Sequence, residues 1–393
     1  MEKQTQPKDP HQRHAVLWKI LRPVARVVCW LKFGYWGHKA RVKGPFLLVS
    51  NHNTNWDPIL VSCSFPEIVY FVSSEHVLRS RLWGRLIRWA MDPIPRQKSG
   101  SAAGTALSML RRLRDGYSVA VFPEGNRSWD GVTRPFSPSI GKLARSCGAP
   151  LVTYKITGGY FASPRWSGNS SRRGRVDGRV VKVYTPEQLK AMSPARIAEH
   201  IREDLFEDAY ARQRNHPIRF NGRHLAEHME TLLFLCPRCG GMHTLQSRDD
   251  TVRCWKCGFV FRYLPTGFLA GEGLPFDELR TANAWQEGEI RRLCDEAGDA
   301  PVFADTDMTC DQVLFAQSEK IVGKGDMRLY RDRLELPGVT VTMDELEGMA
   351  MMGPQDLYVS TSERSYLVRS KRVRCMVKYI TACSHLTGRE LGV

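Results

Sequence analysis

The stretch Phe46-Leu47-Leu48-Val49-Ser50-Asn51-His52-Asn53-Thr54-Asn55-Trp56-Asp57 decides the fold of this chain. Its apolar start follows a Gly-Pro turn, a pattern that predicts a strand running into a buried core. The apolar run ends abruptly in polar residues, so we expect His52 at the strand end, on a loop that opens into a helix near Pro58. Ligands of open α/β sheets bind at such strand ends. The stretch therefore predicts an α/β fold with a site at His52.

His52 and Asp57 can form a dyad across the turn between this strand and the helix. Asp57 would accept the imidazole N–H, fix the tautomer and leave the other ring nitrogen as a general base. A structural interpretation stands beside this one, in which His52 caps the turn and Asp57 caps the helix. A match as short as His-x4-Asp often arises by chance. The motif alone leaves both interpretations open.

A second strand end favours the dyad interpretation over the capping one. The apolar run Val119-Ala120-Val121-Phe122 leads into Pro123-Glu124-Gly125-Asn126-Arg127-Ser128, which brings a carboxylate, a flexible glycine and a guanidinium to a loop. Together, N-H-x4-D and F-P-E-G-x-R-S resemble the motifs of the glycerolipid acyltransferase family, which includes the 1-acylglycerol-3-phosphate acyltransferases. The resemblance covers roughly residues 40–160.

The resemblance implies roles for the residues of both motifs. In the family, the Glu-Gly-x-Arg segment binds the phosphate of the acceptor, which here implies substrate-binding roles for Glu124, Gly125 and Arg127. Arginine suits this task because its rigid guanidinium binds phosphate in a bidentate manner. The middle motif of the family ends in a basic residue, and Ile94-Pro95-Arg96 matches it loosely. Arg96 is therefore a second candidate phosphate ligand.

The reaction implied by the resemblance is acyl transfer. An acyl thioester is already activated, so its transfer to an alcohol needs deprotonation of the hydroxyl, support for the oxyanion and correct positioning. His52 would take the proton, and Asp57 would orient His52. The motif from His52 to Asp57 holds no Ser or Cys, so we expect direct displacement without an acyl-enzyme. The implied donor is acyl-CoA or acyl carrier protein, and the implied acceptor is a lysophospholipid, first of all 1-acylglycerol-3-phosphate, which gives phosphatidic acid.

Two segments depart from the family pattern. Ser74-Glu75-His76 stands where many relatives have a Lys-rich entry to the middle helix. In Pro150-Leu151-Val152-Thr153, a threonine replaces the second proline of the last motif. Because these segments help to shape the acceptor and acyl pockets, another lysolipid or an amine lipid stays open as the acceptor.

Composition points to an anionic partner. The chain has 393 residues and a formal net charge of +16, with 57 Lys+Arg against 41 Asp+Glu. Such an excess favours nucleic acid, an acidic membrane or phosphorylated substrates. Eleven mostly scattered cysteines fit a reducing compartment better than a disulfide framework. Residues 1–14 lack a secretory signal. We expect a cytoplasmic protein attached peripherally to the inner face of the membrane.

Residues 15–36 are the most membrane-like part of the chain. Four cations interrupt the range: Lys19, Arg22, Arg26 and Lys32. Each would cost about 2.5–3.5 kcal/mol at the centre of a bilayer. The first three share one helical face and apolar residues cover much of the rest, which predicts an interfacial helix at an anionic membrane surface. Its boundary would carry Trp18, Trp30 and Trp36. Residues 1–38 thus form a predicted membrane-interface segment, and a surface helix of the soluble core is the alternative.

Residues 39–215 predict the acyltransferase domain, because strands alternate with helices and favour a mostly parallel sheet. The expected strands are 46–49, 68–73, 119–122, 151–156 and 180–184, and the expected helices are 77–90, 101–114, 140–147 and one from 193 onward. The Gly-, Ser- and Arg-rich range 157–185 is expected to be a basic flap that ends in the last strand, which closes the sheet.

Residues 230–265 predict a zinc ribbon. Cys236-Pro237-Arg238-Cys239 and Cys254-Trp255-Lys256-Cys257 have the C-x2-C…C-x2-C spacing of structural zinc sites. Four thiolates close the coordination shell of the metal, so we expect Zn²⁺ to stabilise the fold rather than to catalyse.

Residues 300–393 form a predicted β-rich domain. Short alternating strands are expected at 327–330, 333–336, 339–342, 357–360 and 366–368, and a helix at 374–385. This pattern is similar to that of a pleckstrin-homology-like barrel.

Three other functions compete with acyl transfer. The charge and the zinc ribbon suit a nucleic-acid-binding protein, but the cations follow the amphipathic helix and the acyltransferase motifs, so we expect no nucleic acid. A lipid-binding scaffold with a degenerate site conflicts with the complete motif residues. A zinc hydrolase would need an open coordination position, which four cysteines do not leave.

Overall fold

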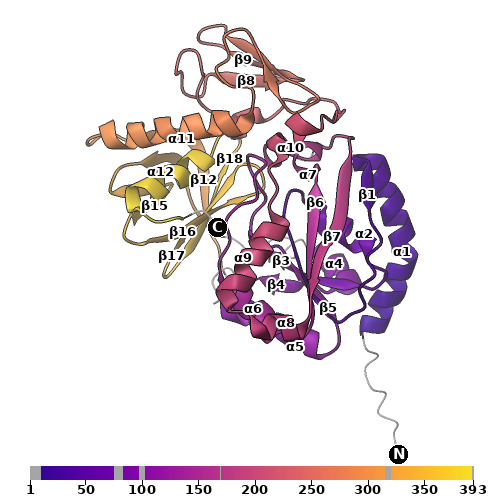
Figure 1. The fold of residues 1–393 in the computed structure, drawn as a ribbon. Helices are drawn as coiled ribbons and strands as arrows, with labels where there is room; N and C mark the ends of the chain where they lie inside the picture. The colour runs from indigo at the N-terminus through magenta and orange to yellow at the C-terminus, as the bar shows by residue number, and fades with distance from the viewer. Residues whose placement is uncertain (1–9, 75–82, 97–101, 169, 315–319, 392–393) are drawn as a thin grey trace, which may run out of the picture. The chain divides into compact units, whose positions relative to one another are not determined.

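The computed structural model describes residues 10–74, 83–96, 102–168, 170–314 and 320–391. The chain forms two compact units (Figure 1). The first comprises Met1–Ala162 and Ser171–Ile218, and the second comprises Ser163–Ser170 and Arg219–Val393.

The first unit is built on a mixed, mostly parallel seven-stranded sheet in the order β1-β7-β6-β2-β5-β3-β4. Five strands run parallel: β2 (Leu47–Ser50), β3 (Val69–Ser74), β4 (Ile94–Arg96), β5 (Ser118–Val121) and β6 (Leu151–Thr157). β7 (Val176–Tyr184) is antiparallel to β6, and β1 (Tyr35–Gly37) is parallel to β7. The predicted α/β class with a mostly parallel sheet is confirmed.

The core lies on both faces of β2, which is completely buried. Side chains of successive strand residues point to opposite faces, and Leu47 and Val49 share one hydrophobic cluster with Met109, Ile140 and Ile201. These partners come from three helices: α5 (Ala102–Arg114), α6 (Ser139–Ser146) and α9 (Pro194–Leu205). α2 (Asp57–Ser64) contacts β1, β6 and β7. Among the described residues, the other helices of the unit are α1 (Pro10–Phe33), α4 (Trp83–Met91), α7 (Gly159–Ala162), α8 (Pro186–Ala191) and α10 (Ala209–Asn215).

The range 157–185 differs from its prediction as a flap. It contains α7, a short 3-10 helix at Arg165–Ser167, and β7, which begins at Val176 rather than at residue 180. β7 is paired with β6 on one side and β1 on the other, and these backbone hydrogen bonds outweigh the local Gly and Arg content. The sheet also ends in β1 rather than in β7, because the residues after α1 add one more strand.

The other predicted helices of this unit lie near their expected positions. The expected helix 77–90 corresponds to α4 in its second half, and residues 77–82 lie outside the described residues, as does His76. The helix expected from 193 is α9, whose Ser193 side chain accepts a hydrogen bond from Arg196 N, as a helix cap does.

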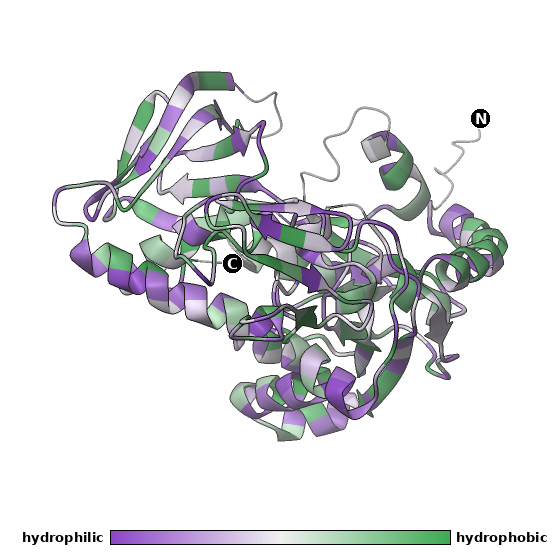
Figure 2. Ribbon diagram, turned by 90° about the horizontal axis from the view of Figure 1, so that it is seen from above, coloured by the Kyte–Doolittle hydropathy of each residue, from purple (hydrophilic) through white to green (hydrophobic). Residues whose placement is uncertain are grey.

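α1 runs along the first unit with its cations arranged differently from the prediction. Arg22 Nε and Arg26 Nη1 donate to the Cys63 carbonyl oxygen near the end of α2, at 3.2 and 3.4 Å. Trp18 is buried and is not a boundary residue. Apolar residues instead cover the exposed side of α1, seen in green in Figure 2: Val16, Ile20, Leu21, Val24, Val27, Val28 and Leu31. Among the described residues, no helix has both the length and the apolar character needed to cross a bilayer.

The second unit contains two antiparallel sheets. The smaller has the order β11-β10-β9-β8 and consists of β8 (Leu245–Arg248), β9 (Thr251–Cys254), β10 (Val260–Tyr263) and β11 (Leu269–Ala270). The larger has seven strands in the order β15-β14-β13-β12-β18-β17-β16. The predicted β-rich C-terminal part of the chain is therefore confirmed.

The strands of the larger sheet include every predicted one and two more. They are β12 (Phe303–Gln312), β13 (Lys320–Leu329), β14 (Arg333–Leu336), β15 (Val339–Thr342), β16 (Leu346–Met352), β17 (Asp356–Thr361) and β18 (Ser365–Ser370). β12 and β16 were not predicted, and neither was α11 (Leu279–Glu296). The expected terminal helix is α12 (Val377–Thr387), and a short 3-10 helix covers Met229–Thr231.

Candidate active site

The loop after β2 is organised by one buried carboxylate. Asp57 Oδ2 accepts hydrogen bonds from the backbone N–H groups of Asn53 and Thr54, at 2.6 and 2.9 Å, and lies 2.8 Å from His52 Nδ1. Its Oδ1 accepts a hydrogen bond from the Thr54 hydroxyl at 2.7 Å. Asp57 is fully buried, so these donors replace the water that would otherwise solvate its charge.

The His52 ring is held on two sides. With Nδ1 donating to Asp57, Nε2 carries the lone pair and is the basic nitrogen. The ring stacks on Phe122, with 4.4 Å between the ring centroids and 18° between the planes. The His52 side chain is 20% exposed, so part of the ring is open to solvent. This geometry favours the dyad, although Asp57 also orders the loop, as the structural interpretation expected.

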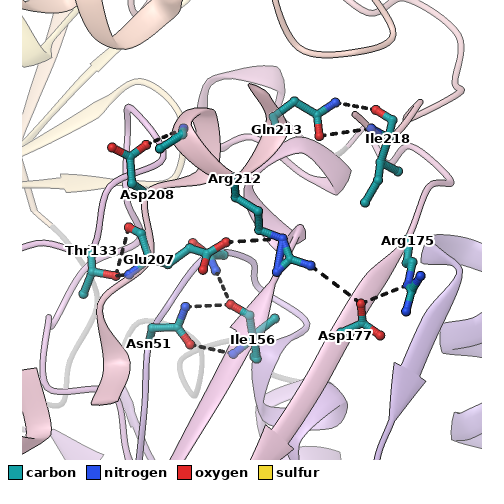
Figure 3. A network of polar contacts seen from close by, with 12 residues as sticks. Asn51, Thr133, Ile156, Arg175, Asp177, Glu207, Asp208, Arg212, Gln213 and Ile218 are labelled. Atoms are coloured by element: carbon teal, nitrogen blue, oxygen red, sulfur yellow. Dashed lines mark hydrogen bonds and ion pairs between the residues drawn. The ribbon is translucent and has the colours of Figure 1, made fainter. Parts of the chain in front are cut away.

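Asn51, which the sequence analysis did not single out, fixes the start of this loop. Its amide nitrogen donates to the Ile156 carbonyl oxygen and its amide oxygen accepts from Ile156 N, both at 2.8 Å (Figure 3). The side chain thus bonds to the main chain of β6 like a short piece of strand. Its position directly before His52 is the signal that could have identified it.

The two motif loops meet through Glu124. Its Oε1 accepts the backbone N–H of His52 at 2.7 Å, and its Oε2 accepts the backbone N–H of Arg134 at 2.8 Å. Ser128 N also donates to the His52 carbonyl oxygen at 3.3 Å. Burial raises the pKa of Glu124 to about 8, against the opposing effect of these two backbone hydrogen bonds. Glu124 therefore links the two loops through hydrogen bonds to their backbone.

The candidate phosphate ligands lie beside the same loops. Gly125 has a φ of 71°, which favours glycine, and a Cβ built there would lie 3.0 Å from Arg96 Nη1. Arg127 is buried, and its burial lowers the pKa to about 10 although the Asp57 carboxylate opposes this shift. Burial also lowers the pKa of Arg96. The structure thus brings Arg96 to the Glu124 loop and Arg127 within electrostatic reach of Asp57.

Further polar contacts hold the segment that follows the Glu124 loop (Figure 3). Thr133 N donates to the Glu207 carbonyl oxygen, and Glu207 N donates to the Thr133 hydroxyl, both at 2.9 Å. The Arg212 guanidinium lies 4.0 Å from Glu207 Oε1 and 3.9 Å from Asp177 Oδ2, and Arg175 Nε lies 3.1 Å from the latter. These residues come from positions far apart in the sequence, so no local pattern indicated them.

In the second unit, the four predicted metal ligands come together. The Sγ atoms of Cys236, Cys239, Cys254 and Cys257 all lie within 4.8 Å of one another. Two of the sulfur pairs are 3.7 and 3.8 Å apart. A tetrahedral zinc site with Zn–S bonds of about 2.3 Å has S···S edges of about 3.8 Å. The cluster therefore has the donor set and spacing for zinc.

Both halves of the cluster are built in the same way. Gly240 N donates to the Cys236 carbonyl oxygen, and Gly258 N donates to the Cys254 carbonyl oxygen, at 2.9 and 3.0 Å. The two glycines have φ values of 64° and 73°. Only glycine adopts this conformation at little cost, so these residues close the two tight turns that present the thiols.

The part of the chain that is similar to known proteins contains both motif loops. Residues 35–157 match the family model named Acyltransferase, a range that contains His52, Asp57, Glu124 and Arg127. Residues 35–157 are therefore similar to the acyltransferase family, and the predicted resemblance is confirmed.

Several named relatives are similar to this domain. The 1-acyl-sn-glycerol-3-phosphate acyltransferase of Borreliella burgdorferi is 27% identical over 123 residues, which covers 30% of this chain and 49% of that protein. The chloroplastic 1-acyl-sn-glycerol-3-phosphate acyltransferase BAT2 of Brassica napus is 29% identical over 147 residues, covering 36% of this chain and 40% of that protein. This chain thus spans about half the length of these relatives, or less.

A solved structure is also similar. The 1-acyl-sn-glycerophosphate acyltransferase PlsC of Thermotoga maritima aligns with a TM-score of 0.42 and 20% identity, over 51% of this chain and 80% of that one.

Proposed function

We propose that the first unit transfers an acyl chain from acyl-CoA or acyl carrier protein to the free hydroxyl of a lysophospholipid, with 1-acylglycerol-3-phosphate as the foremost acceptor and phosphatidic acid as the product. The contact between His52 Nδ1 and Asp57 Oδ2 carries this proposal, because it leaves His52 Nε2 as the basic ring nitrogen. The named relatives support the substrate class.

Each atom of the reaction has a destination. The acceptor hydroxyl gives its proton to His52 Nε2 as its oxygen attacks the thioester carbonyl carbon. The C–S bond then breaks, the acyl chain remains on the new ester, and the imidazolium returns the proton to the departing thiolate. Asp57 keeps the ring in the required tautomer and stabilises the positive charge that develops on it. No acyl-enzyme forms, and His52 ends the reaction in its starting protonation state.

The headgroup of the acceptor is bound by arginine. Arg127 and Arg96 offer guanidinium groups that are partly withdrawn from water, and an anion gains more from such groups than from exposed ones. Glu124 and Gly125 belong to the same acceptor-binding loop in this proposal, and Glu124 also orders that loop. Since both of its oxygens accept backbone N–H groups, it is a positioning residue that keeps the His52 loop against the Glu124 loop.

The cysteine cluster would hold a structural zinc ion. Cys236, Cys239, Cys254 and Cys257 supply four thiolates, which leave no coordination position for a substrate. The ion would cross-link the two tight turns of the smaller sheet. The larger sheet and α12 together would form a pleckstrin-homology-like domain, an assignment that follows from seven antiparallel strands succeeded by one helix.

The membrane is the proposed site of action, because the acceptor is an amphiphile. The exposed apolar side of α1 would lie among the headgroups of an anionic membrane, with Trp30 and Trp36 at the boundary. Peripheral attachment to the inner, cytoplasmic face accords with the positive charge of the chain.

Replacing His52 with Ala tests the function. The variant should transfer acyl chains at least about 100-fold more slowly, because general-base catalysis typically contributes 10²–10⁴-fold. The measurement is acyl transfer from acyl-CoA and from acyl carrier protein to 1-acylglycerol-3-phosphate and to other lysolipids and amine lipids. His200→Ala is a matched control, because His200 is hydrogen bonded to Glu203 on α9. Unchanged turnover in a folded His52→Ala protein would end the proposal.

A further inference from the structure

α4 exposes large apolar side chains next to cations. Leu86 and Trp89 are each 49% exposed and lie three positions apart, so they share one face of the helix. Arg85 and Arg88 are exposed beside them. α4 contains no acidic residue. A short helix with this mixture of Leu, Trp and Arg has the composition of a membrane-surface helix.

α4 is joined to the exposed apolar side of α1. The Arg13 guanidinium lies over the Trp89 ring, 5.1 Å from its centroid, and donates to the Trp89 carbonyl oxygen at 3.0 Å. His14 Nε2 lies 3.0 Å from the same oxygen. One turn further along α1, Val16 begins the exposed apolar residues, which continue to Leu31.

The charge of the two helices selects the kind of partner. Like α4, α1 contains no acidic residue, and its exposed cations include Arg13 and Lys19. An apolar surface bordered by these cations complements an anionic lipid bilayer, which offers both acyl chains and phosphate. Soluble monomeric proteins rarely expose so many large apolar side chains together.

α4 also leads directly to the candidate site. It ends at Met91, β4 begins at Ile94, and the last residue of β4 is Arg96, whose guanidinium lies beside Gly125. We propose that α4 and the exposed apolar side of α1 form one docking surface for an anionic bilayer, and that α4 holds the Arg96 end of the site at headgroup level. The second part rests on the proposed function, because it assigns Arg96 to the acceptor phosphate.

Sedimentation of the full chain with lipid vesicles tests the docking surface. The wild-type protein should bind vesicles of phosphatidylcholine mixed with phosphatidylglycerol more tightly than vesicles of phosphatidylcholine alone. Leu86→Glu should weaken this binding by about tenfold or more, because it removes one apolar side chain that would enter the bilayer and adds a negative charge. Leu107→Glu is the matched control: Leu107 lies on α5, is 55% exposed, and should give wild-type binding.

Activity separates this inference from the proposed function. The rate of acyl transfer by Leu86→Glu to an acceptor embedded in vesicles should fall by the same factor as its vesicle binding. Its turnover on a short-chain acceptor that is monomeric in water should equal that of the wild type. A wild-type protein that binds vesicles but acylates neither acceptor would end the proposed function and leave the docking surface intact.

Two results would overturn the inference. The inference predicts that a second variant, Arg88→Gln, weakens binding to anionic vesicles only. One contrary result is vesicle binding at the wild-type level by both Leu86→Glu and Arg88→Gln. The other is a dimer, seen by sedimentation equilibrium without lipid, that Leu86→Glu dissociates, since the surface would then pair two copies of the chain.

Discussion

Asp57 shows how one side chain can serve both structure and chemistry. Its Oδ2 is shared by two backbone N–H groups and the His52 ring, so the loop cannot rearrange without moving the ring. The two interpretations of the His-x4-Asp motif are therefore not exclusive. A carboxylate that caps its own loop also presents the histidine in one tautomer.

Arg127 should act on the acceptor rather than on the donor. Replacing it with Ala removes a guanidinium from the proposed phosphate site, so the KM for 1-acylglycerol-3-phosphate should rise at least about tenfold, the loss of one charge-assisted contact. The KM for acyl-CoA should change little. Arg127→Lys keeps the charge but loses the bidentate geometry. Its KM for 1-acylglycerol-3-phosphate should therefore lie between the values of the wild type and of Arg127→Ala. Steady-state kinetics with each substrate varied in turn would show this, and equal effects on both KM values would remove Arg127 from the phosphate role.

Glu124 should make the stability of the first unit depend on pH. Burial raises its pKa from 4.5 to about 8. Between these values the unfolded chain has released the proton while the folded chain retains it, so stability falls as pH rises. Glu124→Gln should flatten the denaturation profile over this range, by at most about 1.4 kcal/mol per pH unit.

The control for this pH effect is Glu199→Gln. Glu199 is exposed on α9, and its hydrogen bond to Arg196 lowers its pKa, so it does not titrate in the same range. Urea titrations at several pH values would measure both variants. A Glu124→Gln profile parallel to that of the wild type would show that this carboxyl keeps an ordinary pKa.

At the scale of elements, the second unit is held together by a buried charged network. Lys378 of α12 is fully buried, and its Nζ lies 2.7 Å from Asp305 Oδ2 and 2.7 Å from His243 Nε2. The Tyr379 hydroxyl donates to the same Asp305 oxygen at 2.8 Å, and Arg374 also pairs with Asp305. This network joins the loop after Cys239, strand β12 and the terminal helix.

Lys378→Met should destabilise the second unit by about 3–5 kcal/mol, because it removes the buried cation that pairs with Oδ2 of the buried Asp305. The double variant Lys378→Met with Asp305→Leu should recover much of this loss. Chemical denaturation followed by circular dichroism would measure both. Arg328→Met is the control, since its pair with Asp326 is exposed and such pairs contribute about 0–1 kcal/mol. Equal stability of Lys378→Met and Arg328→Met would mean that the buried network is not cooperative.

At the scale of the whole molecule, the metal should stabilise one unit and leave the other unchanged. Cys254→Ser should lose the single zinc ion predicted per chain and lower the melting temperature of the second unit, because structural zinc contributes directly to folding. The first unit should keep its acyl transfer. Metal analysis, calorimetry and the transfer assay would be combined, with Cys147→Ser, a buried thiol of the first unit, as the control. A stable, metal-free protein without activity would show that the ion does more than hold the fold.

The sequence by itself determined the local features of this protein. Four such features could be predicted from the sequence: the buried strand before His52, the His-x4-Asp turn, the Glu-Gly-x-Arg loop and the two Cys-x2-Cys turns. Each depends on residues a few positions apart, whose spacing fixes which side chains can meet. The alternation of short strands near the C-terminus was readable for the same reason.

Only the tertiary structure decided the long-range features. It turned Arg22 and Arg26 toward α2, which left an apolar side of α1 exposed. It added β1 beyond β7, and it gave Glu124 two backbone partners from separate segments. These outcomes follow from backbone hydrogen bonds and burial between segments far apart in the chain, and such pairings leave no mark on the spacing of neighbouring residues.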